Sequence, residues 1–237
     1  MKLLIVLITY NRLKYTQQTL KGLLRTITVP HYIVVCDNNS TDGTQEWLQD
    51  KADVDRIILN PDNYYPGKAT NIGWKAGLED YNANYLMRLD NDFSFKKGWD
   101  KAAEDYFKKI PELGQLGLDH EAIEHPQAVL REQEVNGKRL NPWPGCVGGV
   151  NIIRRSIWDM GVRYPELMWN DGRNSPMQED SQFSKIIKSK GYLVGHMTED
   201  LARTFANETN WNEFPEYYKK TMTERGYTDN LNKIGGE

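Results

Sequence analysis

Four short apolar runs, each followed by polar residues, dominate the first ninety positions of the chain. They span Leu3–Thr9, 32–37, 56–60 and 84–89. Segments with apolar residues at helical spacing, such as 66–80, lie between them. Strands that alternate with helices through short loops form a mostly parallel sheet with helices packed on its faces. Ligands bind such sheets beyond the carboxyl ends of the strands, so the polar residues there are the first candidates for a functional site.

The second half of the chain has a different pattern. The stretch "AVLREQEVNGKRLNPW" predicts a β-hairpin, because Asn136-Gly137 suits a type I′ turn. We expect a further strand at 150–153 and a later helix that ends at Gly191. The C-terminal residues carry aromatic side chains at helical spacing and should pack back onto the body. Without repeats or an obvious linker, the sequence favours one domain spanning 1–237.

Composition excludes several classes of protein. Apolar and charged fractions of 39% and 27% are ordinary for a globular protein, and a net charge of −3 argues against a general polyanion binder. The apolar run that follows Lys2 is too short for a signal peptide, and no segment reaches the roughly 20 apolar residues that span a bilayer. The two cysteines, Cys36 and Cys146, suggest neither a disulfide framework nor a metal site. We therefore predict a cytoplasmic protein with no integral membrane segment, and peripheral contact with a membrane stays open.

The sequence "LDND" ends the fourth apolar run with two carboxylates, Asp90 and Asp92, on either side of Asn91. These carboxylates repel each other unless a cation lies nearby, and Mg²⁺ or Mn²⁺ prefers such oxygen ligands together with substrate phosphates. An EF-hand is excluded, because its loop would have Phe95 at the position that requires glycine and Lys101 at the position that requires glutamate. A polar turn that caps the next segment explains the same residues and stays open.

Other strand ends carry further candidates. Thr9 begins the stretch "TYNR" and Asp37 follows the second apolar run, where a ribose or base could bind, although helix caps and turns would use the same residue types. Lys68 and Asn71 lie near the start of a helix, a site suited to phosphate, while an isolated surface charge is the alternative for Lys68. Arg88 in the fourth run could pair with an acid or a phosphate.

Two later stretches complete the set. Gly148 and Gly149 precede a strand and would permit close approach of a ligand, and Trp143 beside them could stack on a sugar or belong to the core. Glu179 and Asp180 stand in the first turn of a helix. They either complement the helix dipole or include a general base for a hydroxyl nucleophile.

In this order, "TYNR", "VVCDNNSTDGT", "NIGWKAG", "LDND", "GCVGGVNIIRRS" and "QED" resemble the successive motifs of family 2 glycosyltransferases with the GT-A fold. The resemblance spans roughly residues 3–190. It implies an α/β fold of GT-A type, with a Rossmann-like, mostly parallel sheet flanked by helices and a smaller mixed acceptor-side half. The single domain would divide into a nucleotide-sugar half at 1–95, an acceptor and catalytic half at 96–205 and a C-terminal helical segment at 206–237.

The same resemblance implies a hexosyl- or pentosyltransferase that uses a nucleoside-diphosphate sugar, foremost a UDP-sugar, with Mn²⁺ or Mg²⁺ and inversion at the anomeric carbon. Asp180 would be the catalytic base, Glu179 its neighbour in the catalytic pair, and Asp92 the metal ligand. Donor contacts would come from Thr9, Tyr10, Asn11, Arg12, Asp37, Asn39, Lys68, Asn71, Arg88, Asp90 and Asn91. The acceptor side would include Trp143, Gly148 and Gly149.

One departure concerns the C-terminal histidine that often binds the metal in this family. Thr204 stands near that place in this chain, and His196 is a possible substitute. A sugar-nucleotide nucleotidyltransferase is an alternative, but it would need a loop rich in Gly and Arg after the first strand, where this chain has "TYNR". A non-catalytic nucleotide-sugar or carbohydrate-binding module is another. The acceptor stays open between a glycan, a protein, a lipid-linked saccharide and a modified nucleobase, as does the oligomeric state.

Overall fold

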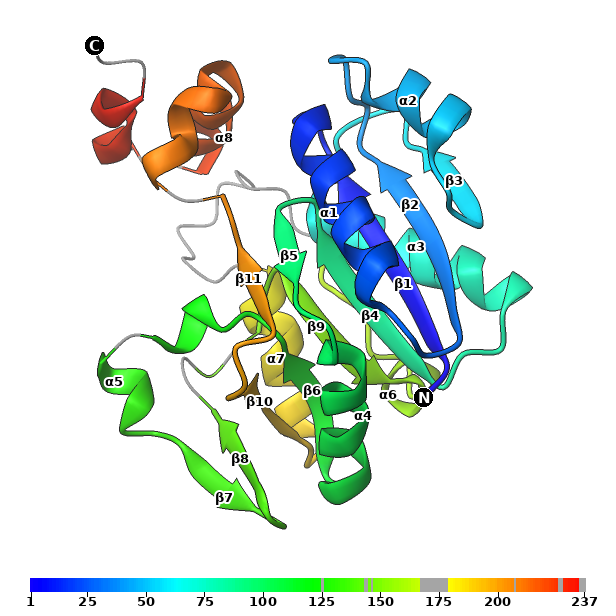
Figure 1. Ribbon diagram of the computed structural model, residues 1–237, viewed down its shortest axis with the longest axis vertical. Helices are drawn as coiled ribbons and strands as arrows, with labels where there is room; N and C mark the ends of the chain where they lie inside the picture. Colours follow the sequence, from blue (N-terminus) through cyan, green and yellow to red (C-terminus); the bar gives the residue numbers. More distant parts are fainter. Residues whose placement is uncertain are drawn as a thin grey trace.

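A nine-stranded sheet forms the centre of the molecule, with strand order β3-β2-β1-β4-β9-β6-β10-β8-β7 (Figure 1). The computed structural model describes residues 1–124, 126–142, 145, 147–166, 179–206, 208–225 and 228–234. The strands of the sheet are β1 (Leu3–Thr9), β2 (His31–Asp37), β3 (Arg56–Leu59), β4 (Tyr85–Asp90), β6 (Leu113–Gly117), β7 (Gln133–Val135), β8 (Lys138–Asn141), β9 (Val150–Arg154) and β10 (Leu193–Met197). Strands β8 and β9 run opposite to the others, so the predicted mostly parallel α/β sheet is confirmed.

Helices cover both faces of this sheet. The α-helices of the described residues are α1 (Leu13–Thr26), α2 (Thr44–Lys51), α3 (Tyr65–Asp80), α4 (Trp99–Lys109), α5 (Pro126–Val129), α6 (Arg155–Asp159), α7 (Glu179–Ser189) and α8 (Pro215–Arg225). Side chains of α1, α2 and α4 share one core layer with Leu3 and Ile5 of β1, whereas those of α3, α6 and α7 share the other with Leu4 and Val6. The two layers follow from the alternation of side chains along a strand, which lets one apolar run face both cores.

Helix α3 lies unusually close to the sheet. A Cβ placed on Gly77 would lie 2.5 Å from Leu4 Cδ1, and one placed on Gly73 would lie 2.7 Å from the Val6 methyl groups. The glycines in "NIGWKAG" thus allow the helix backbone to approach β1 and β2. That contact fixes the start of α3 beside the carboxyl ends of the strands.

Several predicted elements have the expected form. The hairpin of β7 and β8 turns at Asn136 and Gly137, which have φ angles of 50° and 75°. Strand β9 occupies the region expected for a strand, and Gly191, with φ 86°, follows the end of α7. No helix in the described part of the chain is long and apolar enough to cross a membrane.

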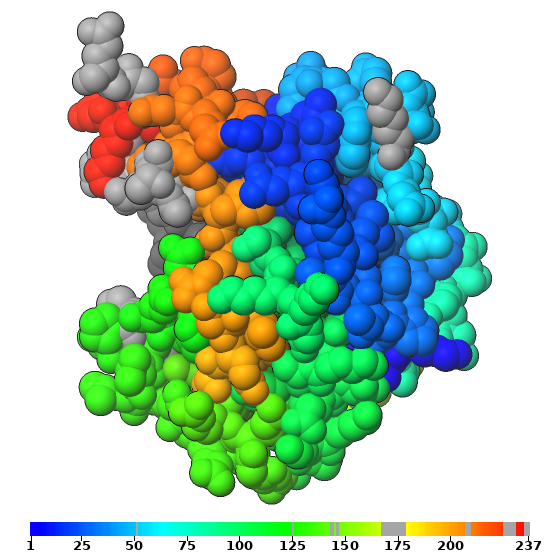
Figure 2. Space-filling view, in the orientation of Figure 1, coloured from blue at the N-terminus to red at the C-terminus, as the bar shows by residue number. Residues whose placement is uncertain are grey.

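The C-terminal segment forms a small cluster of its own. Helix α8 lies between two 3₁₀ helices, Glu208–Glu213 and Thr228–Lys233, and Tyr218 and Met222 are at the centre of the cluster. A short two-stranded sheet of β5 (Phe93–Phe95) and β11 (Ala202–Thr204) leads to it. Figure 2 shows the orange C-terminal residues packed against the blue residues that begin α1.

Candidate active site

The carboxyl ends of β1, β2 and β4 bring polar residues together at one edge of the sheet. Thr9 is in register with Asp37 of β2, and Ile8 is in register with Asp90 of β4. Asn11 and Arg12 follow β1 with φ angles of 52° and 58°, in the left-handed region. Two consecutive non-glycine residues in this region are unusual, and such backbone strain gathers at functional sites.

The Asp37 carboxylate is fully engaged by its own chain. It accepts hydrogen bonds from Thr9 Oγ1 (2.7 Å), from the amide and hydroxyl of Ser40 (2.8 and 2.5 Å) and from Gln45 Nε2 (2.8 Å). The side chain is buried. These bonds shape the turn that holds Asn39 in a left-handed conformation with φ 62°. The buried Asp37 therefore stabilises the turn after β2, whereas Asn39 in that turn is exposed at the surface.

Arg12 is the cation beside Asp92. Its guanidinium donates to Asp92 Oδ2 at 3.1 Å, to Asn91 Oδ1 at 2.6 Å and to the Tyr218 hydroxyl at 3.3 Å. The side chain is buried, and burial alone would lower the pKa of Arg12; the hydroxyls of Tyr217 and Tyr218 and the Asp92 carboxylate outweigh burial and raise it. Burial also raises the pKa of Asp92, against the opposing effect of Arg12.

Arg88 is the cation beside Asp90, as Arg12 is beside Asp92. Its guanidinium donates to both oxygens of Asp90, at 3.1 and 3.2 Å, and to Glu179 Oε1 at 3.2 Å. Burial would lower the pKa of Arg88, but the two carboxylates raise it well above its usual value. Burial raises the pKa of Glu179. The buried arginine thus joins the end of β4 to the start of α7, the helix that carries Asp180.

The two glycines lie where close packing requires them. A Cβ on Gly148 would lie 2.3 Å from Asp180 Oδ2, and one on Gly149 would lie 2.8 Å from the Phe93 ring. Gly149 also has a φ of 55°. The structure therefore places Gly148 directly beside Asp180 and Gly149 against Phe93. Trp143 lies outside the described residues.

Two predicted donor residues make other contacts. The Asn71 amide is occupied by the main chain of Tyr164, donating at 2.8 Å and accepting at 3.1 Å, so this side chain ties α3 to residue 164. Lys68 Nζ lies 3.8 Å from the centre of the Tyr64 ring. The Asn71 contact is tertiary, whereas the Lys68 contact is local, four residues back along the chain. The donor contacts of both residues stay predictions.

The metal ligands were predicted to be Asp92 and His196. His196 is buried in β10 between β6 and β8, and a Cβ at Gly117 would lie 2.3 Å from its ring. Thr204 contacts the Asp92 residue instead, donating from its hydroxyl to the main-chain oxygen at 3.3 Å. Among the described residues, no group of three His, Cys, Asp or Glu side chains is placed to hold an ion. The available ligands are the carboxylate oxygens at the end of β4, a donor set that suits a hard cation shared with a diphosphate.

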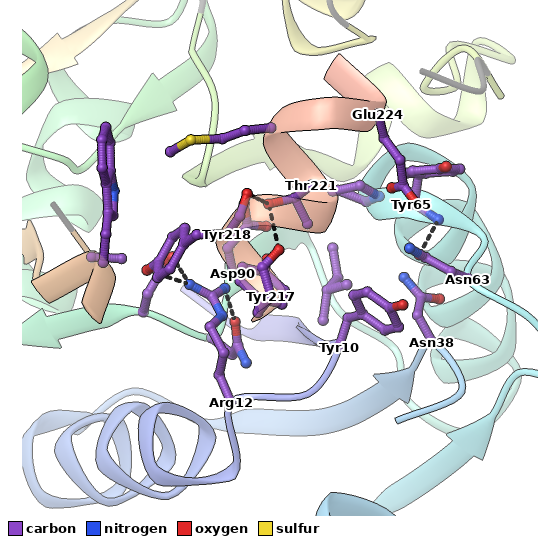
Figure 3. A pocket seen from close by; sticks show the side chains of 17 residues that line it. Tyr10, Arg12, Asn38, Asn63, Tyr65, Asp90, Tyr217, Tyr218, Thr221 and Glu224 are labelled. Carbon is purple, nitrogen blue, oxygen red and sulfur yellow. Dashed lines mark hydrogen bonds and ion pairs between the residues drawn. The ribbon is translucent and has the colours of Figure 1, made fainter. Parts of the chain in front are cut away.

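A cavity of about 390 Å³ opens above these carboxylates (Figure 3). Residues that the sequence did not single out form part of its lining: Asn63, Tyr65, Trp211, Tyr217, Tyr218, Thr221, Met222 and Glu224. Most of them belong to the C-terminal segment, whose aromatic spacing indicated a helix but not its place. Asp119 lies beyond the end of β6, where burial raises its pKa to about 6.

Comparison with known proteins identifies the family. The family model described as "Glycosyl transferase family 2" matches residues 4–159. The chain belongs to glycosyltransferase family 2. It is therefore a glycosyltransferase, and the resemblance found in its sequence motifs is confirmed.

This glycosyltransferase is 23% identical to an uncharacterized glycosyltransferase of Haemophilus influenzae over 98% of its own length and 75% of that protein. Among solved structures it is similar to the mannosyltransferase PcManGT of Pyrobaculum calidifontis in complex with GDP-Man and Mn²⁺, with a TM-score of 0.66, 15% identity and coverage of 96% of this chain and 64% of that one. It is also similar to S. aureus TarS residues 1–349 in complex with UDP-GlcNAc, with a TM-score of 0.62, 18% identity and coverage of 98% and 70%. These neighbours confirm the GT-A fold.

Proposed function

We propose that this glycosyltransferase moves a sugar from a nucleoside-diphosphate sugar, foremost a UDP-sugar, to an acceptor hydroxyl with inversion. The single observation that carries the proposal is the Arg88 bridge. It holds Asp90, at the donor end of β4, beside Glu179, the neighbour of Asp180. The buried Arg88 side chain therefore connects the proposed donor site to the helix that carries the candidate base. The structural neighbours in complex with GDP-Man and UDP-GlcNAc support a nucleotide-sugar donor.

In this proposal the donor half comprises residues 1–95. Tyr10, Asn11 and Asn39 contact the nucleoside, and Thr9 and Asp37 hold the turn beneath it. Arg12, released in part from Asp92, donates hydrogen bonds to the diphosphate, since a guanidinium suits phosphate oxygens. Asp90 and Asn91 lie beside the ribose.

The acceptor and catalytic half comprises residues 96–205. Asp180 accepts the proton of the acceptor hydroxyl as its oxygen attacks the anomeric carbon in line. The bond from that carbon to the diphosphate oxygen breaks with its electron pair, and the nucleoside diphosphate leaves. One displacement of this kind inverts the configuration. Gly148 leaves room for the Asp180 carboxylate, which lies where a Cβ at residue 148 would be.

We propose Mn²⁺ or Mg²⁺ as the cofactor. Asp92 would hold the ion, and the diphosphate and water would complete the shell, because such ions often combine one or two carboxylates with phosphate oxygens. When bound, the ion offsets charge that develops on the leaving group. His196 is not part of this proposal, because its ring is buried against β6. The neighbour in complex with Mn²⁺ supports the choice of metal.

Release of nucleoside diphosphate from a panel of UDP- and GDP-sugars, with and without Mn²⁺, tests the proposal. We expect slow hydrolysis of at least one donor, dependent on the metal and accelerated by an acceptor alcohol. A well-folded protein that neither binds nor cleaves any donor would overturn it. Release of pyrophosphate from a nucleoside triphosphate and a sugar phosphate would instead identify a nucleotidyltransferase.

A further inference from the structure

Helix α8 lies across the strand ends that carry the donor motifs. The cavity of about 390 Å³ above Asp90 and Asp92 adjoins a second one of about 540 Å³, and both are lined by Tyr10 and Tyr217. Tyr10 comes from the end of β1, whereas Tyr217 comes from α8. Figure 3 shows the side chains of Tyr10 and Tyr217 next to each other in the lining of the first cavity.

Contacts between α8 and the donor motifs are specific. The centres of the Tyr10 and Tyr217 rings are 6.0 Å apart, and Lys220 Nζ donates to the Tyr10 hydroxyl at 2.6 Å. The Arg12 guanidinium lies 4.3 Å from the centre of the Tyr217 ring. The Arg12 Nε atom is buried and has no hydrogen-bond partner. Arg12 therefore joins α8 to the proposed diphosphate site.

We propose that α8 is the second wall of the donor site and that Tyr217 contacts the nucleobase. The inference rests on the proposed function and adds the residues that recognise the donor. The diphosphate lies in the first cavity with Asp90 and Asp92, and the base lies against the ring pair formed by Tyr10 and Tyr217 between the two cavities. Tyrosine rings stack on any nucleobase, because every base has a π face.

Lys220 and Tyr65 support this arrangement. Lys220 holds the Tyr10 ring through its hydroxyl and is a positioning residue for the base. Tyr65 lines the first cavity with a left-handed φ of 57°, a strained conformation for a tyrosine at the start of α3. Lys219, the next residue along α8, is exposed and lies 3.8 Å from Glu216, so it offers a matched control.

Calorimetric titration of the full chain with UDP, GDP, uridine and guanosine tests the inference. We expect Tyr217→Ala to weaken binding of the preferred nucleoside and of its diphosphate by about tenfold, since base stacking contributes about 1–3 kcal/mol. Tyr217→Phe should bind like the wild type, because it keeps the ring. Lys220→Ala should weaken binding about threefold and Lys219→Ala should leave it unchanged.

Photochemical cross-linking of 5-iodo-UDP to the wild-type chain avoids any effect of substitution on folding. We expect the cross-link to map to Tyr217 or to its neighbour Tyr218. Cross-links found only outside both α8 and Tyr10, or unchanged affinity in folded Tyr217→Ala, would overturn the inference while leaving the proposed function intact. A wild-type chain that binds neither UDP nor GDP would overturn both.

Discussion

Arg88 and Glu179 form a buried ion pair, and either charge would destabilise the folded chain if its partner were removed. Removing one partner of such a pair costs about 3–5 kcal/mol, because the remaining charge stays buried without compensation. We expect Arg88→Met to lower the free energy of unfolding by about 3 kcal/mol. The double variant Arg88→Met/Glu179→Gln should lie closer to the wild type than the single variant does. Urea denaturation of the wild type, Arg88→Met, Glu179→Gln and the double variant measures this coupling, and strictly additive losses would contradict it.

Asp180 is proposed to act only as the general base, without contact to the donor. Asp180→Asn keeps the shape of the side chain and removes its ability to accept the proton, so we expect transfer to fall by at least about a hundredfold. Donor affinity should stay within about twofold of the wild type, because the proposed base does not hold the donor. Turnover and donor titration separate the two effects. Wild-type turnover in this variant would exclude Asp180 as the base.

Asp119 makes stability depend on pH. Its folded-state pKa is raised to about 6, so the folded chain holds a proton that the unfolded chain releases near its ordinary value. The proton favours folding at pH 4, and this contribution is lost as pH rises through 6. We expect Asp119→Asn to reduce the fall in unfolding free energy between pH 4 and pH 7 by on the order of 2 kcal/mol. Urea denaturation at both pH values measures the difference; an unchanged pH dependence would contradict it.

Helix α3 depends on its glycines for contact with the sheet. Gly77→Ala would place a methyl group 2.5 Å from Leu4 Cδ1. Overpacking of this kind costs about 1–3 kcal/mol, and we expect a loss of that size in thermal or urea unfolding. Gly22→Ala in α1 is the matched control, because nothing lies within 4 Å of its Cβ position. It should stabilise the chain by about 1 kcal/mol through helix propensity.

Local patterns predicted the elements well but not their neighbours. Apolar runs and the Asn136-Gly137 turn are patterns of neighbouring residues, and they predict strands, helices and a hairpin without reference to distant parts of the chain. The place of β9 between β4 and β6 depends on pairing with strands far away in sequence, which no local pattern contains. The position of α8 over the donor motifs has the same origin. For the site, residue types predicted candidate positions at the strand ends, while the hydrogen bonds of Asn71 and Asp37 became visible only with their tertiary partners.

The chain as a unit should respond to donor and metal together. Because the described residues contain no group of three metal ligands, the proposed ion needs the diphosphate to complete its shell. We expect Mn²⁺ alone to shift the melting temperature little, and UDP with Mn²⁺ to raise it more than the two separate shifts combined. A thermal-shift titration in EDTA, in Mn²⁺ and in Mg²⁺ measures this. A large shift with Mn²⁺ alone would point to a site built by protein ligands.

Strand β9 has a consequence for recombining this chain with its relatives. It pairs with β4 on one side and β6 on the other. A strand from the second half of the sequence therefore lies directly beside the last of the parallel strands from the first half. A crossover near residue 95 would separate β4 from the partner it was selected with. Chimaeras that take 85–154 from one parent keep both edges of β9 intact. In such a library, the segment that sets the donor preference and the segment that sets the acceptor preference would overlap in sequence. The two preferences would therefore not be exchangeable by one crossover between two halves.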